Sequence, residues 1–443
     1  MSAPLLTAMG LAGAGGVAIA ALVALTLLPA LLGFAGDRLK PKPKKAPPLG
    51  DQAEPKPTLG ARCVRAVTRV PALTVVLVTA GLLVAAWPAR DLQLALPDNG
   101  SAPESTTQRQ TYDTITEEFG PGLNGPLLIL MNTSDAKATS AKELTAELNT
   151  VRQDLADTEG VALASAARQL DSEHALLTMV PTTSSGDEAT SDLVKALRDK
   201  ESSIRSETGI SLQATGQTAV NVDVSQKLSD SLLTFAIVVV GLCLLILLIV
   251  FRSLVVPVKA TVGFLLSVAA SFGAVVAVFQ WGWATDFIDV AKTGPVVSIL
   301  PIILMAVLFG LAMDYEVFVV SSIHEGYAHG GDARRAVLKG SPLAFRVVTA
   351  AALIMVAVFA VFVTMQDAIV KPIAFALAFG VLIDAFLIRM TFVPAVLMWV
   401  GQAGWWLPPR LQKVLPNVDI EGRDLPKPPA QPSGTPSAVS QRD

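Results

Sequence analysis

The chain has 443 residues, of which 52% are hydrophobic and only 16% are charged, and its mean hydropathy is +0.53. Ordinary soluble domains carry about 25% charged residues, so this composition excludes a typical soluble protein. The formal net charge of −3 decides nothing, because segments of opposite sign nearly cancel.

No catalytic or metal-binding pattern is present in the sequence. It lacks CxxC, HExxH, GxSxG and a Walker phosphate loop, and its three histidines are too scattered for a metal cluster. Its two cysteines, Cys63 and Cys243, do not make a disulfide framework. We therefore expect no enzyme, no cofactor, no metal and no nucleic-acid partner.

Seven segments are long and apolar enough to cross a bilayer, which takes about 20 residues. The first is rich in Gly and Ala and lacks a basic start, so we interpret it as a span rather than a signal peptide. The predicted spans are Pro4–Phe34, Pro71–Trp87, Ser231–Phe251, Val256–Trp281, Pro295–Ile323, Phe345–Met365 and Pro372–Val400.

The distribution of basic residues predicts the topology. Residues 36–70 hold nine Lys and Arg against three Asp and Glu, so the positive-inside rule places this loop in the cytoplasm. Its prolines predict an extended linker. By alternation, the remaining basic clusters fall on the same side; they are Arg252 and Lys259, then Arg334, Arg335, Lys339 and Arg346, and finally Arg410 and Lys413.

Residues 90–228 are then extracytoplasmic. They hold 11 Lys and Arg and 21 Asp and Glu, a local charge of −10. Their periodicity predicts an α+β domain in the order strand, helix, strand, strand, helix, strand, which is the split βαβ (ferredoxin-like) order. An additional helix is expected first. The predicted elements are Ser105–Phe119, Pro126–Met131, Ser140–Asp157, Gly160–Ala166, Ala175–Val180, Asp187–Thr208 and Ile210–Ala214.

The sequence thus predicts a polytopic α-helical membrane protein with about seven transmembrane helices and one extracytoplasmic α+β domain. The expected organisation is a transmembrane helix (1–35), a basic cytoplasmic linker (36–70), a transmembrane helix (71–89), the extracytoplasmic domain (90–228), a bundle of five transmembrane helices (229–402) and a cytoplasmic, mostly disordered tail (403–443).

The segment Gly294–Tyr327 contains the main candidate residue, Asp314, within an apolar run. A carboxylate in a span is costly, so we expect it to face other helices or water and to serve a function, although a satisfied core acid is the alternative. Ala306, Gly310, Asp314 and Ser321 share one helical face, and its small residues favour close approach of a neighbouring helix.

Five more residues, in this segment or in the last span, have a predicted role in the site or in the structure around it. Tyr315 lies 100° from Asp314 on the helix, where it serves either as a hydrogen-bond donor or as a packing residue. Glu316 lies roughly 200° away and is expected to pair with a donor on another helix. Asp384 is a second buried acid, with structural pairing and relay support both open, and Arg389 is expected to snorkel. Pro301 predicts a kink.

Two charged residues at the outer end of the last spans are expected to be solvated. They are Asp367 and Lys371.

Two short stretches indicate an internal repeat. TLLPALL (26–32) and TFVPAVL (391–397) share the pattern T-x-x-P-A-x-L, lie 365 residues apart and are each followed by a polar stretch. Transporters are often built from two parallel repeats. We therefore expect the first helix to be the last helix of a preceding repeat that is missing here, with a bare seven-helix protein as the alternative.

Several longer stretches resemble the second half of MmpL-type (MMPL family) transporters of the resistance-nodulation-division superfamily, found in actinobacteria. They are FGLAMDYEVFVVSSIHE, FRSLVVPVKA, GVLIDAFLIRMTFVPAVL and GWWLP, with GPGLNGPL and GQTA in the outside domain. The resemblance runs in order from about residue 1 to Pro409. It departs from the family at Ser322 and His324, where arginines are usual.

The resemblance implies a porter domain, a proton-driven mechanism and a bacterial plasma-membrane location. It implies that Asp314 and Tyr315 form half of a proton relay, with protons as the coupling ion. The other half would lie in the missing N-terminal half or in another MMPL protomer.

Three functions are consistent with the sequence. The first is export of lipids, glycolipids or other hydrophobic molecules gathered from the membrane. The others are a non-transporting lipid-binding or scaffold subunit, and a drug or antibiotic efflux component. The sequence does not distinguish the first from the last.

Overall fold

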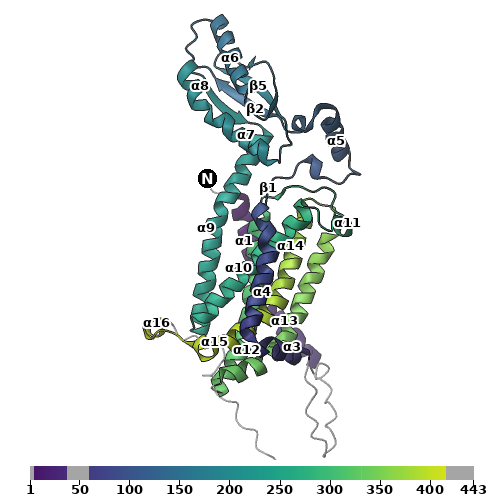
Figure 1. Ribbon diagram of the computed structural model, residues 1–443, viewed down its shortest axis with the longest axis vertical. Coiled ribbons are helices and arrows are strands. Elements are labelled where there is room, and N and C mark those ends of the chain that lie inside the picture. Colours follow the sequence, from purple (N-terminus) through teal and green to yellow (C-terminus); the bar gives the residue numbers. More distant parts are fainter. Residues whose placement is uncertain (1–3, 37–58, 331, 416–443) are drawn as a thin grey trace, which may run out of the picture. The chain divides into compact units, whose positions relative to one another are not determined.

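The computed structural model describes residues 4–36, 59–330 and 332–415 (Figure 1). It divides into two compact units, Met1–Lys56 and Pro57–Asp443. In the first unit, α1 (Pro4–Leu25) and α2 (Leu27–Ala35) are separated at Thr26, whose hydroxyl donates to the carbonyl of Leu22 at 2.6 Å.

Seven helical segments of the described residues are long and apolar enough to cross a membrane. They overlap the seven predicted spans, so the protein is a multi-pass membrane protein. The segments are Gly10–Ala35, Pro71–Asp91, Gln217–Phe251, Val255–Gln280, Leu300–Tyr327, Ala333–Val363 and Val370–Trp405.

The second unit contains a helical bundle. Its helices are α3 (Leu59–Arg69), α4 (Pro71–Ala86), η2 (Trp87–Asp91), α9 (Gln217–Phe251), α10 (Val255–Val275), η5 (Val276–Gln280), α11 (Thr285–Ile288), α12 (Leu300–Gly330), α13 (Ala333–Val363), α14 (Val370–Leu382), η6 (Ile383–Phe392), α15 (Val393–Val400), η7 (Gly401–Trp405) and α16 (Pro409–Val414). Helix α10 is central because it packs against α4, α9, α12 and α14. Most of its side chains are buried, as expected for a helix surrounded by others.

Glycines allow two of these helix pairs to approach closely. A methyl group added at Gly273 of α10 would overlap the carbonyl oxygen of Ala85 in α4. One added at Gly340 of α13 would overlap the carbonyl oxygen of Ser322 in α12. Small residues at such crossings let backbones meet where lipid supplies no hydrophobic driving force.

The α/β domain contains a five-stranded antiparallel sheet. Its strands are β2 (Leu127–Asn132), β3 (Val161–Ala164), β4 (Arg168–Gln169), β5 (His174–Pro181) and β6 (Ser211–Thr215), in the order β3-β5-β2-β6 with β4 beside β5. The remaining elements are η3 (Asn99–Ser101), α5 (Thr107–Phe119), η4 (Pro121–Asn124), α6 (Ala141–Ala156), α7 (Glu188–Asp199) and α8 (Glu201–Thr208).

Alternation along β2 builds the core of this domain. Leu127, Ile129 and Met131 are buried and belong to one cluster with residues of α6 and α7, while the intervening residues are less buried. Opposite β2, the register pairs Ile129 with Leu177 of β5. This period of two is what a sheet with helices on one face requires.

Most predicted elements of the domain are present, with shifted ends. Two details are wrong. The structure adds β4, which is too short to give a periodic signal, and Asp187–Thr208 is two helices that meet at Lys200.

The prediction of an extended linker is also partly wrong. Residues 37–58 of the linker lie outside the described residues, but its end forms α3, which packs against α13 and α15. No proline occurs between Pro57 and Pro71, and Val64 is fully buried. Of the predicted tail, only residues up to 415 are described, and they include α16.

Two connections join the α/β domain to the bundle. Helix α9 runs without interruption from the domain into the bundle (Figure 1). Strand β1 (Leu94–Ala95) pairs in parallel with β7 (Val296–Val297), which lies directly before α12. Ser225 of α9 and Ser298, which follows β7, share a hydrogen bond of 2.7 Å between their hydroxyls. The start of α12 is therefore tied to both connections.

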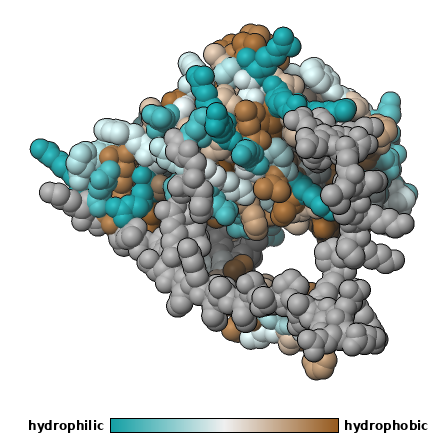
Figure 2. All heavy atoms as spheres, turned by 90° about the horizontal axis from the view of Figure 1, so that it is seen from below, coloured by the Kyte–Doolittle hydropathy of each residue, from teal (hydrophilic) through white to brown (hydrophobic). Residues whose placement is uncertain are grey.

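The opposite end of the bundle is basic. Helix α3 and the turn between α12 and α13 lie at this end (Figure 1), and Figure 2 shows many hydrophilic side chains on it. The exposed basic residues here are Arg62, Arg65, Arg69, Arg334, Arg335 and Lys339.

The prediction of a kink at Pro301 is wrong. Pro301 is the second residue of α12, where a missing N–H leaves no helical hydrogen bond unmade.

The glycine contact between α10 and α4 yields a stability prediction. Gly273→Ala should lower the free energy of unfolding by about 1–3 kcal/mol, because the helices must separate. Gly241→Ala in α9 is the matched control, since nothing lies within 4 Å of the added methyl group. Thermal unfolding of the purified chain in detergent measures both, and equal melting temperatures for the two variants would contradict the packing described.

Candidate functional site

Three consecutive residues of α12 point in different directions. Asp314 is exposed, Tyr315 is 6% exposed and Glu316 is fully buried. Successive residues of a helix are 100° apart, so the acids at 314 and 316 face nearly opposite sides. This confirms the expectation that Asp314 and Glu316 do not share a site.

Glu316 joins a buried cluster of four charged side chains. Its carboxylate accepts hydrogen bonds from Lys259 of α10 and from Arg389 of η6. The Nε atom of Arg389 also donates to Oδ2 of Asp384 at 3.1 Å. The exposed fractions are 4% for Lys259, 0% for Glu316, 2% for Asp384 and 1% for Arg389.

The cluster is balanced in charge, with two cations and two carboxylates. Buried charges are tolerated when they are paired and hydrogen-bonded. Because three helical segments contribute to it, the cluster also fixes the positions of α10, α12 and η6 relative to one another. The prediction that Glu316 pairs with a donor on another helix is confirmed.

The π-helical geometry of η6 explains the pairing of Asp384 with Arg389. The two residues are five positions apart, a spacing that does not place side chains together on an α-helix. A π-helix has i→i+5 hydrogen bonds, and Thr391 likewise donates to the carbonyl of Phe386, five residues before it. The expectation that Arg389 snorkels is therefore wrong, because the turn directs it into the bundle.

Two polar atoms beside the cluster lack partners. Tyr315 Oη and Asp384 Oδ1 are buried, and neither makes a hydrogen bond with any residue that the structure describes. Both atoms therefore have unused hydrogen-bonding capacity.

Asp314 lies on an exposed face of α12. Ala306, Gly310 and Asp314 are exposed and Ser321 is half-buried, so the predicted face of small residues is turned away from the rest of this unit. A methyl group added at Gly310 would meet nothing within 4 Å. No hydrogen bond joins Asp314 to another described residue.

Two lysines were placed wrongly by sequence reasoning. Lys259 was expected to flank a cytoplasmic turn and Lys371 to be solvated, but both are buried. Asp367 is exposed as expected, and it accepts from the backbone N–H groups of Ile369 and Val370. Lys259 lies inside a predicted span, and a cation in a span is itself a signal for a buried partner.

The chain also matches known proteins. A family model described as the MMPL family matches residues 1–91 and 101–417. The chain belongs to the MMPL family.

Relatives within the family extend this finding. The membrane protein YdfJ of Bacillus subtilis is 40% identical, over 96% of this chain and 57% of its own length. The mycolic acid-containing lipids exporter MmpL11 of Mycolicibacterium smegmatis is 30% identical, over 96% of this chain and 44% of its own. The heme uptake protein MmpL11 of Mycobacterium tuberculosis is 31% identical, over 96% and 44%. The chain thus spans about half the length of the curated relatives it matches.

Because Glu316 is buried and Asp314 is exposed, replacing these two acids of α12 should affect stability differently. Glu316→Gln should lower the free energy of unfolding by about 3–5 kcal/mol, because it leaves two buried cations with reduced compensation. Asp314→Asn should change it by less than about 0.5 kcal/mol, because the side chain is exposed. Unfolding of the purified chain in detergent compares the two directly. A large loss in Asp314→Asn, or none in Glu316→Gln, would refute this assignment.

Proposed function

We propose that this chain supplies the second repeat of a transporter driven by the proton-motive force, with lipids, glycolipids or other hydrophobic molecules as cargo. The observation that carries the proposal is Asp314, an exposed carboxylate in the middle of a membrane-spanning helix. Such residues mark ion or substrate pathways far more often than they serve packing. Protons are then the coupling ion, and the protein needs no other cofactor and is not an enzyme.

The proton relay that we infer has two parts. Asp314 takes up and releases a proton on the exposed face of α12, and Tyr315 extends the path toward Asp384 on the buried face. Glu316 helps to hold α12 against α10 and η6. Asp384 serves both as a partner of Arg389 and as support for the relay.

The other half of the relay would come from a partner. The exposed face at Ala306, Gly310 and Asp314 has the small residues that transmembrane helices use for close contact. We propose that this face meets the N-terminal half of the transporter or another MMPL protomer. The coverage of about half of each relative supports this division.

The orientation follows from charge. We propose that the basic end of the bundle, the residue 36–70 linker and the C-terminal residues 403–443 are cytoplasmic. The α/β domain within residues 90–228 is then an extracytoplasmic porter domain. Its strand order supports a ferredoxin-like classification. The chain would reside in a bacterial plasma membrane, with the helices of 1–35, 71–89 and 229–402 crossing it.

The cargo that we propose is hydrophobic or amphipathic. One relative is named a lipid exporter and another a heme uptake protein, and both cargoes are hydrophobic or amphipathic. Drug or antibiotic efflux would use the same mechanism. A non-transporting lipid-binding or scaffold subunit is the alternative of a different class. One relative is named for export and another for uptake. The assay should therefore measure transport in both directions.

The transport test uses Asp314→Asn in the assembled transporter, with the candidate N-terminal half co-expressed. Proton-dependent transport of a labelled lipid in proteoliposomes should fall by at least about 100-fold, because the asparagine amide neither gains nor loses a proton at physiological pH. Membrane insertion should be unchanged. Asp286→Asn, an exposed acid outside the spans, is the matched control and should transport normally. Wild-type transport by Asp314→Asn would rule this residue out as the proton carrier.

A further inference from the structure

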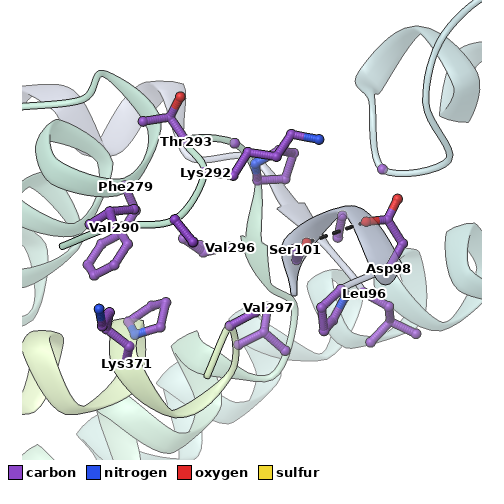
Figure 3. Close-up of a pocket in the computed structure, with 18 of the residues that line it drawn as sticks. Leu96, Asp98, Ser101, Phe279, Val290, Lys292, Thr293, Val296, Val297 and Lys371 are labelled. Atoms are coloured by element: carbon purple, nitrogen blue, oxygen red, sulfur yellow. Dashed lines mark hydrogen bonds between the residues drawn. The ribbon is translucent and has the colours of Figure 1, made fainter. Parts of the chain in front are cut away.

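A cavity lies where the loops of the bundle meet the segment that leads into the α/β domain. Its volume is about 160 Å³, which is smaller than the roughly 300–1,000 Å³ of pockets that enclose whole drug-sized ligands. Figure 3 shows Lys371, Val296 and Phe279 on one side and Ser101 and Asp98 on the other. The cavity is large enough for a compact polar group and too small for a complete lipid.

Lys371 places a buried positive charge in the wall of this cavity. Its side chain is 5% exposed, and Nζ donates to the carbonyl oxygens of Ile288 at 3.1 Å and Asp289 at 2.6 Å. The Oε1 atom of Gln366 lies 3.5 Å away. Within the described residues, all of these acceptors are neutral, and no carboxylate comes within ion-pair distance of this ammonium group.

Lys292 adds a second positive charge at the rim. Its side chain is exposed, and Nζ lies 5.3 Å from the centre of the Tyr112 ring. A cation over an aromatic face is weakly attracted and stays available to other partners. Lys292 also forms no ion pair within the part of the chain that the structure describes.

The carboxylates of the lining are in a different situation. Asp98 accepts from Gly100 N at 3.0 Å and from the hydroxyl of Ser185 at 3.0 Å. Asp187 accepts from Ser184 N at 2.8 Å, and Asp367 caps the start of α14. All three side chains reach water, which stabilises their charge. Among the charged residues that line the cavity, Lys371 alone is buried, and it has no countercharge among the described residues. Such a charge is costly unless it is paired.

The rest of the wall is apolar. Leu96, Phe279, Val290, Val296 and Val297 line it. A ligand with an anionic group and an attached hydrocarbon chain would satisfy both parts of the wall. A free anion would satisfy only the lysines.

From this arrangement we infer that the cavity binds the anionic headgroup of a membrane amphiphile, such as a phosphate or carboxylate, within the positive field of Lys371 and Lys292, which both line it. The apolar residues contact the beginning of the hydrocarbon chain, which continues toward the bilayer. This site is separate from the cluster around Glu316. The inference requires only that the chain spans a membrane, so it can fail while the transport proposal stands, and the reverse.

The hydrocarbon chain of the bound amphiphile would also contact the segment that precedes α12. Val296 and Val297 form β7, which pairs with β1 and ends three residues before Leu300, the first residue of α12. Occupation of the cavity would therefore stiffen the connection between the α/β domain and the helix that carries Asp314.

Binding can be measured on the full purified chain in a neutral detergent. Short-chain phosphatidylglycerol, short-chain phosphatidylcholine and inorganic phosphate are titrated, and the rise in melting temperature gives an apparent Kd for each. Phosphatidylglycerol should stabilise the wild-type chain and phosphatidylcholine should not. Lys371→Met and Lys292→Met should each weaken phosphatidylglycerol binding about tenfold, because each removes one positive charge close to the headgroup.

Lys142→Met is the control, because Lys142 is an exposed lysine of α6 in the α/β domain and its loss should not change binding. Lys292→Met guards against a folding defect at the buried Lys371. Stabilisation by inorganic phosphate that is lost in the same two variants would support the anion site and assign it to free anions. Equal stabilisation by the two lipids, or unchanged phosphatidylglycerol binding in both lysine variants, would overturn the inference.

Discussion

The bundle depends on one carboxylate, Glu316, that lies between two cations in a region from which water is excluded. Lys259 reaches it from α10 and Arg389 from η6, and Arg389 also holds Asp384. Alone, each of these charges would be too costly to bury. Together they are balanced, and the geometry that balances them also fixes which helices are neighbours. Since replacing a buried ion pair by apolar residues is often neutral for stability, specificity of packing, or a role in moving protons, is the better explanation for keeping such a cluster.

Helix α12, which carries Glu316, presents different residues on its two faces. Its buried face is bound to the bundle through Glu316, whereas its opposite face presents Asp314 among small residues with no described neighbour. Tyr315 lies between them, and its hydroxyl makes no hydrogen bond with a described residue. In the relay that we propose, Asp314 thus titrates on a helix whose other side is attached to the bundle.

The junction between the bundle and the α/β domain is also held by pairs of groups, a pair of strands and a pair of hydroxyls. Strands β1 and β7 contribute only two residues each, yet they join the two parts of the unit, and the hydroxyl pair of Ser225 and Ser298 ties α9 to the same place. The buried ammonium of Lys371 lies beside this junction. A site for an anionic headgroup there would let the membrane itself influence how the α/β domain is attached.

The sequence by itself determined the number of spans, the α+β order of the domain and the family, because these depend on apolar length, on periodicity and on motifs in order along the chain. It also identified Asp314 and Glu316, since charges within apolar runs are rare. Only the tertiary structure decided the partners. Lys371 lies at the edge of an apolar run, where a solvated position is equally consistent with the sequence, and the sequence does not identify Glu316 as the partner of Lys259. The position of Arg389 depended on the π-helical turn of η6, which brings residues five positions apart together and has no periodic signal in the sequence.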